Sequence, residues 1–371
     1  MTNKWAHLLL ALRTPTAMAG FDTDVWDLLV RQAASAGLLG RLGALAREAG
    51  IEEKLPQAVR HHMQAVMTLA EQQQRAVRWE LVNLSETLSE LQGPVVLLKG
   101  AAYAAAGLAP GPGRLFSDID LLVPKSQIHI AEAALMLGGW NSSHHDSYDQ
   151  RYYRDWMHEL PPMTHIHRQT VLDLHHNILP ETARIRTHPE RILAQASPLA
   201  DFPRFGIPCP ADQVLHSATH LFHEGEWEHG LRDLVDLDAL LRAYGHESGF
   251  WTSLITRATE LKLGRPLFYG LRYCQKLLLT PVPADVLQRC PRRPGAAGAL
   301  AMDCLFMPAF STAHHSCRHW FAGVAVFTLY VRSHWLRMPF HLLLPHLVRK
   351  SWKQRVEALV KREPLERAET P

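Results

Sequence analysis

The sequence predicts an α+β protein in which helices precede and follow a small mixed β-sheet. Three observations lead to this prediction. Short apolar runs at 95–98, 119–123 and 171–175 have the length and boundaries of buried strands. Apolar residues at helical spacing fill 22–91 before these runs and return at 212–244 after them. The chain has 371 residues with 47% hydrophobic and 20% charged content, which is typical of a globular protein with a substantial core.

The first region, residues 1–92, is expected to be helical. Its opening stretch, MTNKWAHLLLALRTPTAM, has one early Lys and only a short apolar part, so we interpret it as an amphipathic helix rather than a signal peptide. Helical spacing then continues through VWDLLVRQAASAGLLGRLGALA and again over 59–91. Gly50 and Pro56 separate these two stretches.

Residues 93–180 are expected to contain the sheet. Val95-Val96-Leu97-Leu98 is short, apolar and bounded by Pro and Gly, which predicts a buried strand. Lys99-Gly100 follows and opens an alanine-rich helix, AAYAAAGLA. The loop PGPGR then leads into a second strand that carries two acids, and a polar, aromatic stretch separates it from a third strand at 171–175.

The remainder of the chain is expected to be mostly helical, with Pro-rich breaks at 281–283 and 291–294. These patterns divide the chain into four predicted regions: 1–92, helical; 93–180, the core with the sheet; 181–300, helical and closing a cleft; and 301–371, basic, aromatic and helical.

Two acids two positions apart are the most informative residues of the sequence. Asp118 and Asp120 lie in the run Arg-Leu-Phe-Ser-Asp-Ile-Asp-Leu-Leu-Val, and a strand places such residues on one face. Burying two like charges together is costly unless a cation neutralises them, and a divalent metal with oxygen ligands does so. Metal held by paired carboxylates is a common device for handling phosphates.

Two further features fit this chemistry. The Lys99-Gly100 turn places a helix N-terminus, with its unpaired N–H groups and partial positive charge, beside the strand ends, where it could receive a phosphate. Asp173 lies on the third strand, and three carboxylates on neighbouring strands could hold two Mg²⁺ ions roughly 3.5–4 Å apart.

The segments LLKGAAYAAAGLAPGPGRLFSDIDLLV and VLDLHHNI resemble the uncharacterised nucleotidyltransferase family of the polymerase-β-like superfamily. The resemblance covers roughly residues 22–245. It implies a nucleotidyltransferase core in which Gly100-Ala101 matches the superfamily's Gly-Ser or Gly-Gly turn. Asp118 and Asp120 match its Asp-x-Asp strand, and Asp173 matches its third acid.

The resemblance implies Asp118, Asp120 and Asp173 as catalytic metal ligands, for two Mg²⁺ ions or alternatively Mn²⁺. The predicted nucleotide-binding residues are Lys99, Gly100, Arg114, Ser117 and His175. His175 faces the same side as Asp173 and is expected to bind a carboxylate or the acceptor. One departure is Ala101, where the superfamily has Ser or Gly; Lys99 and Arg114 are hypothesised to supply the missing phosphate contacts.

The implied reaction moves a nucleoside monophosphate from an NTP to an unidentified hydroxyl or phosphate acceptor, such as a small molecule, a sugar or a protein. Pyrophosphate leaves, and Asp173 is the candidate general base. The alternative is a degenerate member of the fold that binds nucleotide as a regulator or scaffold, which Ala101 favours and the three acids oppose. A weaker alternative is a toxin-type enzyme that modifies RNA or protein.

Composition restricts the other possibilities. The formal net charge of +3 does not by itself indicate nucleic acid, and no specific nucleic-acid partner is predicted. The five cysteines form no CxxC pair or zinc spacing, which is typical of reduced thiols and a cytoplasmic protein. The histidines are scattered, and His216, His220 and His223 share one helix face that we interpret as the polar lining of a cleft.

Two hypotheses concern residues after the core. Arg232 and Asp236, four apart on a helix, are expected to form a surface ion pair, or alternatively to approach the nucleotide. No acid lies between Asp303 and Glu357, an interval that mixes Arg and Lys with Trp and Leu. The segment 318–355 is therefore open to two interpretations: a helical core element with a basic face, or a segment in peripheral contact with the inner face of a membrane.

Overall fold

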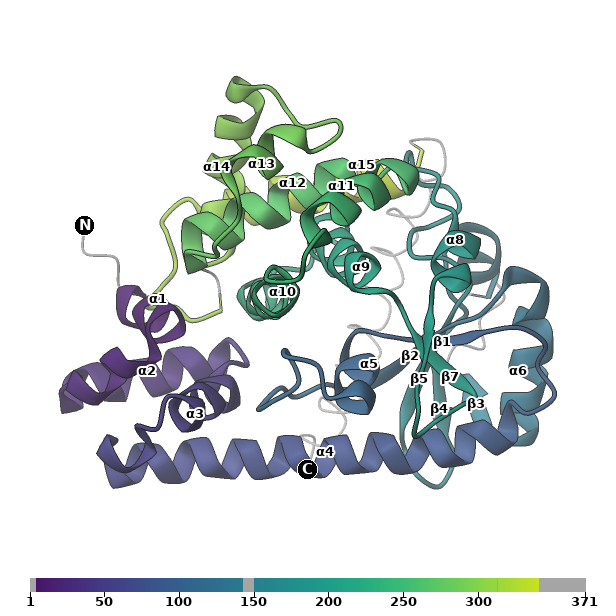
Figure 1. Cartoon of the computed structure of the whole chain (residues 1–371), viewed down its shortest axis with the longest axis horizontal. Helices are drawn as coiled ribbons and strands as arrows, with labels where there is room; N and C mark the ends of the chain where they lie inside the picture. The colour runs from purple at the N-terminus through teal and green to yellow at the C-terminus, as the bar shows by residue number, and fades with distance from the viewer. Residues whose placement is uncertain (1–4, 143–149, 312, 340–371) are drawn as a thin grey trace, which may run out of the picture.

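The computed structural model describes residues 5–142, 150–311 and 313–339. It confirms the α+β class: one mixed sheet of seven strands lies at one side of the molecule, and helices build the rest (Figure 1). The strands lie in the order β3-β4-β5-β2-β1-β7-β6. Their bounds are β1 (Val95–Leu98), β2 (Asp118–Leu122), β3 (Trp140–Ser142), β4 (Met163–His165), β5 (Val171–His175), β6 (Ser197–Pro198) and β7 (Phe205–Ile207).

The helices come before, between and after these strands. They are α1 (Ala6–Arg13), α2 (Thr23–Ser35), α3 (Leu39–Glu48), α4 (Gln57–Thr87), α5 (Lys99–Ala106), α6 (Ile128–Leu137), α8 (Pro189–Ala194), α9 (Pro210–His223), α10 (Gly230–Tyr244), α11 (Phe250–Glu260), α12 (Gly264–Tyr273), α13 (Ala284–Arg289), α14 (Ala296–Ala309) and α15 (Ala322–Arg337). Short 3₁₀ or π turns are η1 (Pro15–Gly20), η2 (Glu52–Lys54), η3 (Lys125–Gln127), η4 (Tyr152–Trp156) and η5 (Cys274–Leu278).

The register of the central strands aligns the predicted acids. β2 pairs with β1 in antiparallel and with β5 in parallel orientation, and Asp120 lies directly opposite Asp173. Leu122 lies opposite His175 in the same ladder. Because side chains alternate along a strand, Asp118 and Asp120 share one face of the sheet with Asp173 and His175.

The sheet is wider than the sequence predicted. β7 pairs in parallel with β1, and β6 pairs with β7, so two strands come from beyond the predicted core of 93–180. With three and two residues respectively, β7 and β6 are too short for alternation to show in the sequence.

Helix α4 connects the N-terminal helices to the sheet. It has 31 residues, runs along one side of the whole molecule (Figure 1), and contains neither Gly nor Pro. Its first half, with Val59 and Met63, is buried with the N-terminal helices, whereas Val77, Leu81 and Leu84 belong to the core beneath the sheet. The predicted region 1–92 is therefore joined to the sheet through one continuous helix.

A buried ion pair fastens α4 to the sheet. Glu80 is 1% exposed and accepts hydrogen bonds from Arg168, with Arg168 Nε 2.9 Å from Glu80 Oε2 and Nη2 2.5 Å from Oε1. The Arg168 guanidinium also lies 5.7 Å from the ring centre of Trp140, which is fully buried on β3. This contact holds the β4–β5 turn, and with it the strand that carries Asp173, against α4.

The C-terminal helices lie on the far side of α9 and α10 from the N-terminal helices. α14 packs against α15, and α15 also contacts α9. α15 exposes large apolar side chains, including Phe327 at 67%, and Trp320 just before it is 81% exposed. Across the described ranges, no helix combines the length and the apolar character that crossing a membrane requires.

Replacing Glu80 with Ala is expected to destabilise the protein by about 1.5–3 kcal/mol, because it removes the charged hydrogen bonds from the half-buried Arg168. Glu86→Ala, on an exposed position of the same helix, is the matched control and should change the free energy of unfolding by less than about 0.5 kcal/mol. Urea denaturation measures both. Equal stability of the two variants would contradict the anchoring role of Glu80.

Candidate active site

A cavity of about 410 Å³ lies between the polar face of the sheet, the start of α5 and the helices α9 and α10. It gathers residues from distant parts of the sequence, and α15 also reaches it. The side chains that line it are Lys99, Gly100, Tyr103, Arg114, Phe116, Ser117, Asp118, Asp120, Met157, His158, Glu159, Asp173, His175, Ser217, His220, Glu224, Glu226, His229, Arg232, Asp233, Asp236 and Arg337. Every site residue predicted from the sequence is in this set.

The floor of the cavity holds a group of potential metal ligands. One ligand atom each from Asp120, Asp173 and His175 lie within 4.8 Å of one another. Asp173 Oδ1 is buried and has no hydrogen-bond partner in the described structure. A buried carboxylate oxygen that receives no hydrogen bond is suited to be the ligand of a cation. Asp118 lines the same cavity, but its carboxylate is outside this close group.

His175 holds the floor together from both of its ring nitrogens. Its Nε2 lies 2.9 Å from Asp120 Oδ1, and its Nδ1 lies 3.2 Å from Glu159 Oε2. Since both nitrogens face carboxylates, His175 orients Asp120 rather than offering a free lone pair to a metal. The expectation that His175 binds a carboxylate of the site is thus confirmed by geometry.

Sequence reasoning missed Glu159 and its neighbour His158. Both lie in the stretch between 138 and 170 that lacks a periodic pattern, and Glu159 reaches the site through an isolated bridge to His175. His158, Glu159 and His175 form a second close group of potential ligands, and His158 Nδ1 is buried without a partner. No local sequence pattern predicts an isolated bridge such as that between Glu159 and His175.

The carboxylates of the floor are unequal. Burial, followed by the charge of Asp120, raises the pKa of Asp173 to about 7 and that of Asp118 above its ordinary range. Burial acts in the same direction on Asp120, but Lys99 and the hydrogen bond from His175 outweigh it and lower the pKa of Asp120. Burial alone lowers the pKa of His175, but its hydrogen bond to Asp120 and the charges of Glu159, Asp120 and Asp173 raise it to about 9. Asp118 and Asp173 thus resist ionisation beside an ionised Asp120, and a site of this kind favours a bound positive charge.

Lys99 and Gly100 lie at the cavity as predicted, and Gly100 has a packing role in addition. Lys99 lines the cavity, and its Nζ is 4.0 Å from Glu224 Oε1 on the opposite wall. Lys99 has a φ of +40°, and α5 begins at this residue. A Cβ on Gly100 would lie 3.0 Å from Phe116 Cβ, so this glycine is required for the close packing of the loop before β2 as well as for access to the cavity.

Two other predicted contacts have a different setting. Ala101 is fully buried in the core that contains Leu97 and Leu121, so its side chain does not face the cavity and a hydroxyl there would not reach a ligand. Arg114 is 8% exposed, and its Nε lies 2.5 Å from Asp236 Oδ2. The guanidinium of Arg114 is therefore neutralised and ties the loop before β2 to α10. Ser117 is exposed at the cavity edge.

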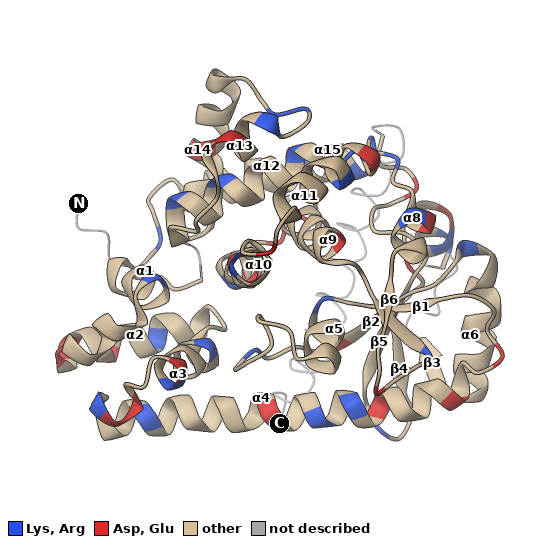
Figure 2. Ribbon diagram, in the orientation of Figure 1, with Lys and Arg blue, Asp and Glu red and all other residues tan. Residues whose placement is uncertain are grey.

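The opposite wall is built by α9 and α10, where acidic and basic residues lie close together on α10 (Figure 2). The expected pair of Arg232 and Asp236 is wrong: Arg232 Nη2 lies 3.0 Å from Asp233 Oδ1, while Asp236 is buried and bound to Arg114. Burial explains the difference, because Asp236 is 6% exposed and a buried carboxylate needs a buried cation, which Arg114 provides.

The three histidines of α9 separate into two groups. His220 lines the cavity, and its Nε2 is 2.5 Å from Glu224 Oε2. His216 and His223 are buried and are outside the cavity lining, so the predicted polar cleft face applies to His220 alone.

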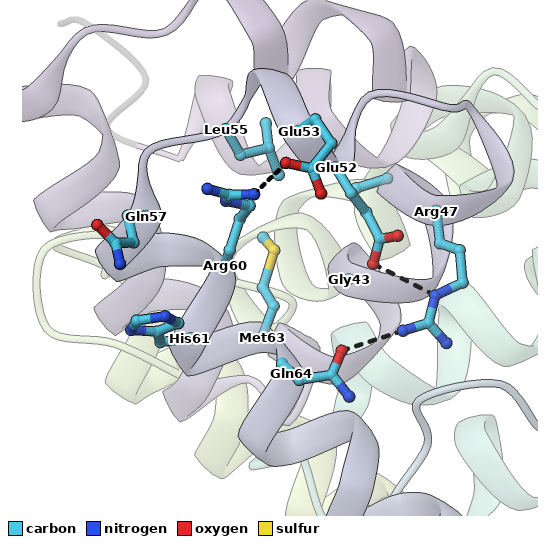
Figure 3. A pocket seen from close by; sticks show the side chains of 11 residues that line it. Gly43, Arg47, Glu52, Glu53, Leu55, Gln57, Arg60, His61, Met63 and Gln64 are labelled. Carbon is cyan, nitrogen blue, oxygen red and sulfur yellow. Dashed lines mark hydrogen bonds and ion pairs between the residues drawn. The ribbon is translucent and has the colours of Figure 1, made fainter.

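A second hollow, of about 310 Å³, lies at the far end of the molecule between α3, η2 and α4. Its charged side chains are bound to one another: Arg47 to Glu52 and Gln64, and Arg60 to Glu53 (Figure 3). It has no cluster of metal ligands and no strand end, so we assign the chemistry to the sheet cavity.

Comparison with known proteins agrees with the geometry. A search of curated proteins found no match. The model of the family "Uncharacterised nucleotidyltransferase" matches residues 22–279, which include the whole sheet, α9 and α10. Because this match covers more than half of the sequence and contains the acidic strand pair, the chain belongs to the uncharacterised nucleotidyltransferase family.

Proposed function

We propose that the protein transfers a nucleoside monophosphate from an NTP to an acceptor hydroxyl or phosphate, with Mg²⁺ held by Asp120 and Asp173 and by Asp118 beside them. The observation that supports this most is the unpartnered Asp173 Oδ1 next to Asp120 in an acidic cavity. When bound, Mg²⁺ neutralises phosphate charge and lowers the pKa of the attacking hydroxyl.

The excess of acidic over basic side chains in the cavity supports a role for metal ions in binding the NTP. Eight Asp or Glu side chains line it against four Lys or Arg. An NTP carries several negative charges, and this lining would repel it without divalent cations. Carboxylate oxygens are the ligands that Mg²⁺ prefers, with Mn²⁺ as the alternative ion, so the donor set fits.

The residues have separate roles in the proposed reaction. His175, itself held by Glu159, fixes the orientation of Asp120. Asp173, whose pKa burial raises to about 7, is also the candidate general base for the proton of the acceptor. Lys99 and the first N–H groups of α5 attract the phosphates. Arg114 positions the loop before β2 and does not itself carry free charge.

The alternative of a degenerate, nucleotide-binding regulator loses its main argument. It rested on Ala101, and this side chain lies in the core rather than at the cavity. A cytoplasmic location remains a prediction, as does membrane contact through 318–355, of which 340–355 lie outside the described residues.

Asp120→Asn and Asp173→Asn are each expected to lower Mg²⁺-dependent pyrophosphate release from labelled NTPs by about 10²-fold or more, because each removes a metal ligand. The same variants should bind Mn²⁺ more weakly in an electron paramagnetic resonance titration. Asp285→Asn, an exposed acid far from the cavity, is the control and should match the wild type. Undiminished turnover in Asp173→Asn would refute the metal-site assignment.

Lys99→Ala is expected to weaken the binding of a non-hydrolysable Mg²⁺·NTP analogue by about tenfold, because a charged hydrogen bond to phosphate is lost. Isothermal titration calorimetry measures the dissociation constant. Lys125→Ala serves as the control, since Lys125 is exposed and pairs with Glu181 at 3.0 Å outside the cavity. If both variants bind alike, Lys99 has no phosphate role.

The full-length protein is expected to float with vesicles that contain anionic lipid at low salt and to stay in the lower fractions with neutral vesicles. Phe327→Glu, which places a charge on the exposed apolar side of α15, should abolish flotation. Absence of lipid binding by the wild-type protein at low salt would exclude membrane contact.

A further inference from the structure

Arg337, the last residue of α15, lines the cavity although it lies 58 residues beyond the end of the family match at residue 279. Among the described residues, it is the one lining residue supplied by the C-terminal helices. The family match thus covers the floor and the α9–α10 wall, and a helix outside the match completes the lining. This arrangement raises the question of what a distal arginine does there.

Neighbouring groups hold the end of α15 in place. The last carbonyls of a helix lack intrahelical donors and need partners elsewhere. Here the Arg184 backbone N–H donates to Leu336 O at 3.0 Å, and Thr182 Oγ1 donates to Arg337 O at 2.8 Å. The Arg184 guanidinium donates to Trp335 O at 3.1 Å and lies 3.9 Å from the Trp335 ring centre. Arg337 is therefore held at a defined position.

The donors come from the segment that follows the catalytic strand. Thr182 and Arg184 lie shortly after β5, which carries Asp173 and His175. The position of α15 is thus tied to the floor of the cavity by a short stretch of chain rather than by long-range packing alone.

α15 also interlocks with the loop that brings Glu224 and Glu226 to the cavity. Gly225 in this loop has a φ of +79°, and a Cβ there would lie 2.2 Å from Ser333 Oγ. Arg332 Nη1 donates to Phe222 O at 2.9 Å at the end of α9. Only glycine permits this approach, so α15 and the cavity wall form one packed unit.

Among the described residues that line the cavity, Arg337 is a cation without a carboxylate partner. Of the four Lys and Arg residues of the lining, Arg114 is bound to Asp236, Arg232 to Asp233, and Lys99 lies 4.0 Å from Glu224. In the described part of the chain, no carboxylate pairs with Arg337. An arginine that lines a cavity and has no carboxylate partner is suited to a phosphate, which its planar fork can bind through two hydrogen bonds.

We propose that Arg337 binds phosphoryl oxygens of the nucleoside triphosphate and that Thr182 and Arg184 are positioning residues that hold it there. The inference rests on the proposed nucleotidyl transfer and adds a substrate-binding residue from outside the family match. α15 is then part of the active site, and its hold on β5 keeps the phosphate contact and the metal ligands in register.

The test uses the full-length protein and two probes, a non-hydrolysable Mg²⁺·NTP analogue and Mg²⁺·tripolyphosphate, with affinity measured by calorimetry. Arg337→Ala is expected to weaken both by about tenfold, and Arg337→Lys by less, because Lys keeps the charge without the fork. Thr182→Val, which removes only the hydroxyl, should weaken both by about threefold to fivefold. Arg318→Ala, an exposed residue outside the cavity lining, should bind as the wild type does.

The outcomes separate this inference from the proposed function. If the wild-type protein binds neither probe, the nucleotidyl-transfer proposal fails and the inference fails with it. If the wild type binds both and Arg337→Ala binds equally well, only the role of Arg337 is overturned. Thermal denaturation of each variant identifies unfolded protein, and in that case Arg337→Lys decides: affinity equal to the wild type at unchanged stability overturns the bidentate contact.

Discussion

The pairing of β2 with β5 is the constraint on which the site depends. This ladder sets Asp120 directly opposite Asp173 and brings His175 to the same face. A shift of one residue would turn one strand's acids into the core, where Ile119 and Leu172 now lie. The apolar residues that alternate with the acids therefore fix the register, and the carboxylates are forced together as a result.

This pairing places buried carboxylates close together, and neighbouring groups reduce the repulsion between their charges. Neighbouring carboxylates in a buried place resist ionisation, and His175 and Lys99 provide partial compensation. Glu159 in turn holds His175 from the other side. The site is left with one carboxylate oxygen, Asp173 Oδ1, that nothing in the described structure satisfies. A buried polar atom without a hydrogen bond requires an explanation, and binding of a cation would provide one here.

Much of this could be predicted from the sequence, because the relevant signals are local. The strands at 95–98 and 171–175, the acidic strand and the Lys99-Gly100 turn each show in a few consecutive residues. Contacts between distant segments could not be predicted: Arg114 with Asp236, and Glu159 with His175, are set by packing between elements with no shared pattern. Strands of two or three residues, such as β6 and β7, carry no periodicity at all.

The loop before β2 rests against the N-terminal helices at a point where no side chain fits. A Cβ on Gly113 would lie 2.1 Å from the Gly40 carbonyl oxygen of α3, and Gln74 of α4 donates to Gly111 O at 2.8 Å. This direct contact between two backbones restricts the position of the loop that leads into Asp118. The N-terminal helices therefore help to position the strand that begins at Asp118. A methyl group added at Gly40 would lie 2.3 Å from the Gly113 carbonyl oxygen, so the loop before β2 would have to move away from α3.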